Sequence, residues 1–94
     1  MGPIKGRPYL LSRARVEPEK LPEFRAWLRR VHIPNMLAVP GIVEAVRLQA
    51  GQSGPNSLTA YVFESDAVIQ KALNSQEAAH ARADWETWLP HIRN

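Results

Sequence analysis

Apolar and polar residues alternate in three segments of the chain, which is the pattern of β-strands with covered faces. These segments span residues 8–16, 42–50 and 58–64 and are rich in Tyr, Leu, Ile and Val. In the first segment, alternation places Leu10, Ser12, Ala14 and Val16 on one face and Tyr9, Leu11, Arg13 and Arg15 on the other. Residues 51–57 are mostly Gly, Ser, Asn and Pro, so we predict a hairpin between the second and third strands.

Between the first two strands, apolar residues recur at the three- and four-residue spacing of a helix. The apolar stripe of this helix consists of Leu21, Phe24, Leu28 and Val31. Glu17-Pro18-Glu19 suits the start of the helix, because Pro is tolerated in the first turn and acidic groups favour the positive helix end. Pro34 lacks an amide hydrogen, so we expect the helix to kink or end near Ile33, with one further turn before Pro40-Gly41.

The last third of the chain predicts two more helices. Ser65 or Asp66 caps the first, a short helix that carries Val68, Ile69, Ala72 and Leu73, and Ser75 can cap the second. The second helix has Ala78, Ala81, Trp85, Trp88 and Leu89 on one side. Pro90 ends it, and residues 91–94 are at most the stub of a fourth strand.

This order of elements, β-α-β-β-α-α, predicts an α+β fold with a ferredoxin-like antiparallel sheet and helices on one face. The other face of the sheet would then be bare. We expect it to carry Leu11, Val43, Tyr61 and Phe63, or their neighbours of opposite parity. An apolar patch of that kind favours burial against a partner. We therefore predict a homodimer formed through the sheet face.

Composition narrows the class of protein further. The 94 residues predict one domain over residues 7–94, preceded by a flexible leader at residues 1–6. The absence of cysteine excludes disulfides and thiolate catalysis. We see neither a signal peptide nor a membrane-spanning stretch and expect a cytoplasmic protein. Because the net charge of +3 comes from scattered basic residues, nucleic acid is an improbable partner.

Three parts of the sequence carry a family resemblance. The first part is FRAWLRRVHIP (residues 24–34), with its His-x-Pro, and the second is VPGIV (residues 39–43). The third combines FESD (residues 63–66), ALNSQE (residues 72–77) and ADW (residues 83–85). In this order and spacing they resemble the dimeric α+β barrel superfamily, especially its EthD-like and antibiotic-biosynthesis-monooxygenase-like branches.

The resemblance implies a homodimer with a ligand pocket between sheet and helices. It also implies activities that need no tightly bound cofactor, on small aromatic or polyketide-like compounds. Heme-handling and uncharacterised members exist as well, so the resemblance does not choose a reaction. One departure stands out: a full fourth strand, usual in such proteins, is here short, replaced or supplied otherwise.

His32 is the sharpest candidate for chemistry, because imidazole accepts and donates protons near neutral pH. In resembling enzymes a His at this place faces the pocket. The alternative is a structural His32 that bonds to backbone groups freed by Pro34. Tyr61 is the second catalytic candidate, as a hydrogen-bond donor to a substrate oxygen, or else a residue of the core or the dimer interface.

The candidate substrate-binding residues are Arg13, Arg47, Trp27 and Trp85. A strand-centre Arg that faces a cavity can hold a carboxylate or enolate oxygen. Either Arg can instead be solvated or paired with Glu44 or Glu64. The Trp residues either line the pocket, as the resemblance suggests, or simply pack in the core together with Trp88.

We expect neither a metal nor another cofactor. His32, His80 and His91 lie on separate elements without metal-ligand spacing. The leading hypothesis is a small-molecule enzyme acting on a hydrophobic oxygenated or aromatic compound, with His32 as proton shuttle. The reaction would be that of an isomerase, a lyase or cyclase, or a monooxygenase. The alternative is a non-catalytic ligand-binding or accessory protein of the same fold.

Overall fold

The computed structural model describes residues 6–49 and 54–93, so residues 1–5 of the expected leader lie outside it. Its centre is a three-stranded antiparallel sheet of β1 (Tyr9–Ala14), β2 (Ile42–Leu48) and β3 (Ser57–Phe63). The order in space is β1-β3-β2, so β3 is central and β1 and β2 are the edges. The pairing of β2 with β3 confirms the predicted hairpin partners.

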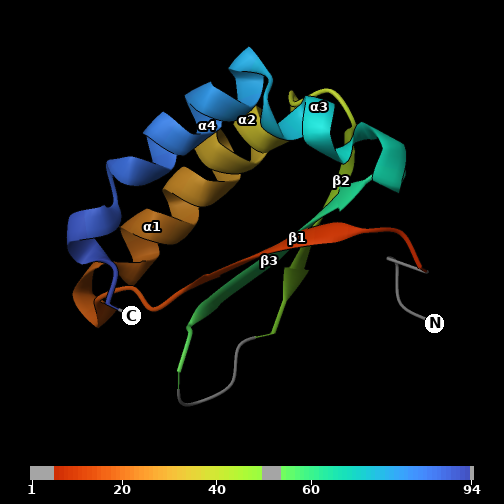
Figure 1. Ribbon diagram of the computed structural model, residues 1–94. Helices are drawn as coiled ribbons and strands as arrows, with labels where there is room; N and C mark the ends of the chain where they lie inside the picture. Colours follow the sequence, from red (N-terminus) through yellow and green to blue (C-terminus); the bar gives the residue numbers. More distant parts are fainter. Residues whose placement is uncertain (1–5, 50–53, 94) are drawn as a thin grey trace.

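The helices cover one face of this sheet (Figure 1). In chain order they are η1 (Pro18–Lys20), α1 (Leu21–Trp27), η2 (Leu28–His32), α2 (Ile33–Leu37), η3 (Asp66–Val68), α3 (Ile69–Leu73), α4 (Gln76–Glu86) and η4 (Leu89–His91). The Ser75 hydroxyl accepts a hydrogen bond from the amide of Ala78 at 3.1 Å, which confirms the predicted cap of α4. The predicted α+β, ferredoxin-like architecture is confirmed.

The helix from α1 to α2 widens at η2, which is a π-helical turn. There the amide of Ile33 donates to the carbonyl of Leu28, five residues earlier, instead of four. The wide turn directly precedes Pro34, whose missing amide hydrogen would otherwise interrupt an α-helical ladder. The chain therefore stays helical as far as Leu37, and the geometry changes at His32 without ending the helix.

Two groups of buried side chains form the core under the helices. One surrounds Phe24, whose ring centre lies 5.3–5.9 Å from those of Trp27, Trp85 and Trp88. The other gathers residues of β2, β3 and the helices around Tyr61 and is completed by Val39, Ile42, Phe63, Ala72 and Ala78. All three Trp residues thus contribute to the core, which agrees with the interpretation that they pack there.

Of the two alternatives for the bare face, the one that places Tyr61 and Phe63 there is wrong, and the opposite parity holds for β3. Both are buried, with 1% and 3% of their surface exposed, and they belong to the core under the helices. Tyr61 stands opposite Leu10 and Ala45, so these three side chains share the covered face. The open face carries the residues of opposite parity, of which Tyr9, Leu11 and Leu48 are exposed apolar side chains.

After α4, the chain returns to the end of β1 for a single bridge between Val16 and Ile92. The amide of Arg93 donates to the carbonyl of Arg15 at 2.7 Å. The amide of Glu17 donates to the carbonyl of His91 at 3.0 Å. In the described residues the fourth strand is therefore reduced to this one bridge. None of the helices in the same part of the chain has the length and apolarity needed to cross a bilayer.

Candidate functional site

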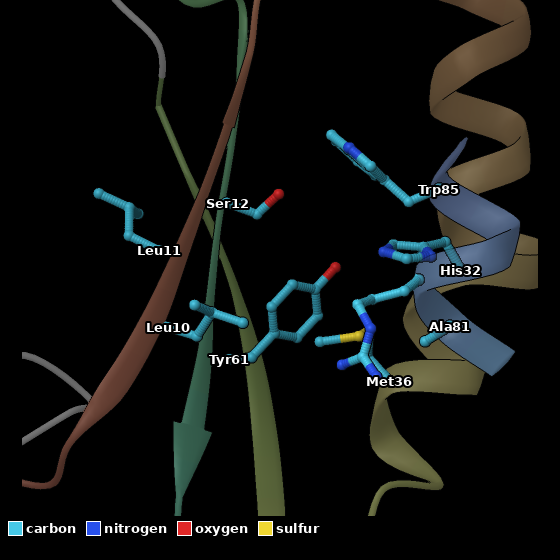
Figure 2. Close-up of a pocket in the computed structure, with 9 residues that line it drawn as sticks. Leu10, Leu11, Ser12, His32, Met36, Tyr61, Ala81 and Trp85 are labelled. Carbon is cyan, nitrogen blue, oxygen red and sulfur yellow. The ribbon is translucent and has the colours of Figure 1, made fainter. Parts of the chain in front are cut away.

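A pocket of about 210 Å³ lies between the β1 side of the sheet and the helices. It is lined by Leu10, Leu11, Ser12, His32, Met36, Tyr61, Ala81, Arg82 and Trp85. The side chains of Leu10 and Ser12 point into the space under the helices, while that of Leu11 points away from it (Figure 2). The pocket is open to solvent on one side, and most of its lining is apolar.

His32 reaches this pocket from the last position of the π-helical turn. Its ring stacks on Trp27, with centres 4.9 Å apart and planes inclined by 16°, and it also contacts Trp85 at 5.3 Å. Within the described part of the chain, the buried Nδ1 atom has no hydrogen-bond partner. Two aromatic rings therefore hold the imidazole in place, and its far edge points across the pocket toward Tyr61 (Figure 2).

The charge nearest to His32 belongs to Asp84 on α4. The Oδ2 atom of Asp84 is 3.8 Å from His32 Nδ1, too far for a hydrogen bond but close enough to favour a proton there. The same Oδ2 atom accepts a hydrogen bond from Asn35 Nδ2 at 2.8 Å. Burial lowers the pKa of His32 below 6.5, and the Asp84 carboxylate offsets this only in part. Burial therefore favours the neutral imidazole, which is the form that can accept a proton.

Tyr61 faces His32 from the middle of β3. The two ring centres are 6.3 Å apart and nearly perpendicular, and the hydroxyl points into the pocket (Figure 2). This hydroxyl is buried and has no hydrogen-bond partner among the described residues. Burial raises the pKa of Tyr61 to about 12, against the opposing charge of Arg47, so the phenol keeps its proton. It can donate that hydrogen to an oxygen atom of a ligand.

No protein-family model matches the chain, and no curated protein does so either. Among solved structures, it is similar to an ethyl tert-butyl ether d (EthD) family protein from Bacillus halodurans. The sequences are 16% identical, the TM-score is 0.69, and 89% of each chain is covered. The fold is EthD-like.

The EthD-like fold brings only some of the predicted site residues together. His32, Tyr61 and Trp85 line the same pocket, and the ring of Trp27 stacks on that of His32. Arg47 lies on β2, at the opposite edge of the sheet from β1, and lines a different pocket. Arg13 stands opposite Leu58, on the open face of the sheet.

Sequence reasoning missed Asp84 and Asn35, which contact each other and, through Asp84, His32. Asp84 lies within the Ala83-Asp84-Trp85 segment that supported the family resemblance, so a signal existed. Its importance depends, however, on a contact with Asn35 across 49 positions of the chain. The spacing of residues within one helix does not reveal such a contact.

The other two histidines lie away from this pocket. His91 Nδ1 is 3.0 Å from Glu17 Oε1, and His80 lines a separate surface hollow beside Asn35 and Glu77. Across residues 6–49 and 54–93, no group of three or more His, Cys, Asp or Glu side chains is placed to hold a metal ion. The polar side chains that line the described pocket are Ser12, His32, Tyr61 and Arg82, and of these His32 and Tyr61 are the buried ones.

Proposed function

We propose that the pocket binds a small, mostly apolar carbonyl compound and that His32 moves a proton on it while Tyr61 donates a hydrogen bond to its oxygen. One observation carries this proposal: a neutral imidazole and a protonated phenol, both buried, face each other across an apolar pocket. Leaving a buried hydroxyl unpaired costs about 1–3 kcal/mol, which an acceptor oxygen on a ligand would relieve.

The size and lining of the pocket limit the ligand. A cavity of about 150 Å³ lined by apolar side chains accepts benzene. The 210 Å³ here therefore suits one ring with a short substituent. Leu10, Met36 and Trp85 would contact the ring, and Tyr61 marks the position of its oxygen.

The supported chemistry is proton transfer next to a carbonyl group. Nδ1 of His32 faces Asp84, so the proton acceptor is the other ring nitrogen, which faces the pocket. This nitrogen takes a proton from the carbon beside the carbonyl. The electron pair left on that carbon forms a C=C bond, and the carbonyl oxygen becomes an enolate that accepts from Tyr61. In a β,γ-unsaturated ketone, the imidazolium returns the proton to the γ carbon and completes an isomerisation. In a β-hydroxy ketone, the enolate expels the hydroxyl group, which takes the proton from the imidazolium and leaves as water. Neither route requires an oxidant or reductant.

Deuterium exchange on phenylacetone in D2O tests this function directly. We expect the protein to accelerate exchange at the carbon between ring and carbonyl, followed by proton NMR, and to bind phenylacetone more tightly than propylbenzene. Tyr61→Phe should reduce the preference for phenylacetone over propylbenzene about tenfold, because the substitution deletes one buried hydrogen bond to the ketone. Equal binding of both compounds without exchange would contradict the proposal and favour a non-catalytic ligand-binding protein.

We also propose that a second copy of the chain covers the open face of the sheet. The support is the row of exposed apolar side chains at Tyr9, Leu11 and Leu48, beside the small residues Ala60 and Val62 of the central strand. Two such faces can pack on each other about a twofold axis.

Leu11→Lys is expected to weaken this dimer about 10²-fold or more, since the twofold axis places two charges in the apolar interface. Sedimentation velocity should show wild-type protein at twice the chain mass at micromolar concentration, and the variant as single chains. Leu73→Lys, at an exposed leucine of α3, is the matched control and should remain dimeric. A wild-type protein that sediments as a monomer would refute the interface.

A further inference from the structure

A second pocket, of about 260 Å³, lies at the β2 side of the molecule and contains three arginines. It is lined by Arg25, Leu28, Arg29, Ile33 and Arg47. Arg25 and Arg29 are four residues apart on the helix, so their side chains lie on the same face. None of these residues lines the pocket of His32 and Tyr61. The two pockets therefore have no lining residue in common.

The positive charge of this pocket is not neutralised by the protein. Throughout the described residues, no carboxylate lies within 4.0 Å of any of the three guanidinium groups. Like charges four residues apart on a helix destabilise it, and burial together with Arg25 lowers the pKa of Arg47. An anion in the pocket would relieve this repulsion.

Arg47 is held in place by neutral partners. Its Nη1 atom donates to the hydroxyl of Ser57 at 3.2 Å, to the carbonyl of Leu58 at 3.1 Å and to the hydroxyl of Thr59. These contacts orient the guanidinium without cancelling its charge. Its remaining N–H groups have no acceptor in the part of the chain that the structure describes, so they are available to a ligand.

We propose that this pocket binds the phosphate group of an organic phosphate monoester. Three guanidinium groups match the charge and the three terminal oxygens of a phosphate dianion better than the single charge of a carboxylate. Leu28 and Ile33 complete the lining with apolar surface, against which the organic part of the ester packs. This site goes beyond the proton transfer proposed for His32 and does not depend on it.

Titration with phenyl phosphate, followed by amide NMR shifts at low salt, tests the site. We expect saturable binding that Arg25→Gln and Arg29→Gln each weaken about tenfold, because each removes one charged hydrogen-bond donor. Both side chains are on the surface, so the amide spectrum should otherwise stay that of the wild type. The matched control is Arg30→Gln, an exposed neighbour that does not line the pocket and should change affinity less than twofold.

Two further ligands define the chemistry. Inorganic phosphate should bind several-fold more weakly than phenyl phosphate, and benzoate more weakly still. An equal loss of affinity for phenyl phosphate in Arg25→Gln and Arg30→Gln would overturn the proposal, since binding would then reflect general charge attraction. Benzoate binding as tight as phenyl phosphate, or no saturation at all, would overturn it as well. Because no residue of the His32 pocket lines this one, failure of the proton-transfer proposal is distinguishable from failure of this one.

Discussion

Replacing His32 by Gln is expected to slow the exchange of phenylacetone by about 10²–10⁴-fold, the usual contribution of a general base. Glutamine keeps a polar side chain of similar reach but cannot take up a proton near neutral pH. Exchange rates from proton NMR at saturating ketone measure the effect. His80→Gln, at an exposed histidine of α4, is the matched control and should exchange at the wild-type rate. Unchanged exchange in His32→Gln would rule out His32 as the base.

The pH dependence of the same reaction reports on the surroundings of His32. Because burial lowers its pKa, the exchange rate should rise with pH to a plateau, with a midpoint below pH 6.5. Asp84 raises the pKa of His32, so Asp84→Asn should shift this midpoint to lower pH. Tyr61, with its pKa raised to about 12, should keep the plateau flat through moderately alkaline pH. A midpoint above 6.5 would contradict the electrostatic account.

Phe24→Ala should lower the free energy of unfolding by about 3–5 kcal/mol, a large share of the ~5–15 kcal/mol typical of a domain. Phe24 is fully buried, and its ring contacts Trp27, Trp85 and Trp88, so truncation leaves a cavity that these rigid rings cannot close. Urea unfolding followed by tryptophan fluorescence, at one fixed protein concentration, measures the loss.

A loss below about 1 kcal/mol in Phe24→Ala would show that the aromatic cluster is not a principal source of stability. Phe24→Leu, which retains most of the volume, should cost less than half as much. Two of the same tryptophans contact the His32 ring, so the cluster links the stability of the domain to the position of the proposed base.

The sequence predicted the elements better than it predicted their faces. Most strand and helix positions followed from local patterns, such as the alternation in β1 and the Ser75 cap. Two details did not: Ser65 makes no side-chain cap bond, and α4 ends at Glu86, before Pro90. The orientation of β3 did not, because both of its faces are apolar: Tyr61 and Phe63 lie on one and Leu58 and Val62 on the other. Which of two apolar faces the helices cover depends on packing between distant segments, and alternation alone contains no information about it.

The candidate site shows the same division. His32 stood out from its chemistry and its place before Pro34, and Tyr61 from its position on a central strand. That the two share a pocket follows from the pairing of β3 with β1 and from the helices above, neither of which is a local property. Arg47 was grouped with them because it lies at the middle of a strand, yet β2 is the far edge of the sheet.

The wide turn before Pro34 makes the direction of the His32 side chain depend on a residue count. Each residue of an α-helix advances its side chains by about 100° around the axis. The wide turn accommodates one residue more than an α-helical turn, so winding residues 28–32 as ordinary α-helix, with none removed, would rotate α1 by about that angle relative to His32 and α2. The face of α1 that carries Phe24 would then no longer match the imidazole across from Tyr61. The proposed proton-transfer arrangement thus depends on the π-helical turn itself as well as on the residues that line the pocket.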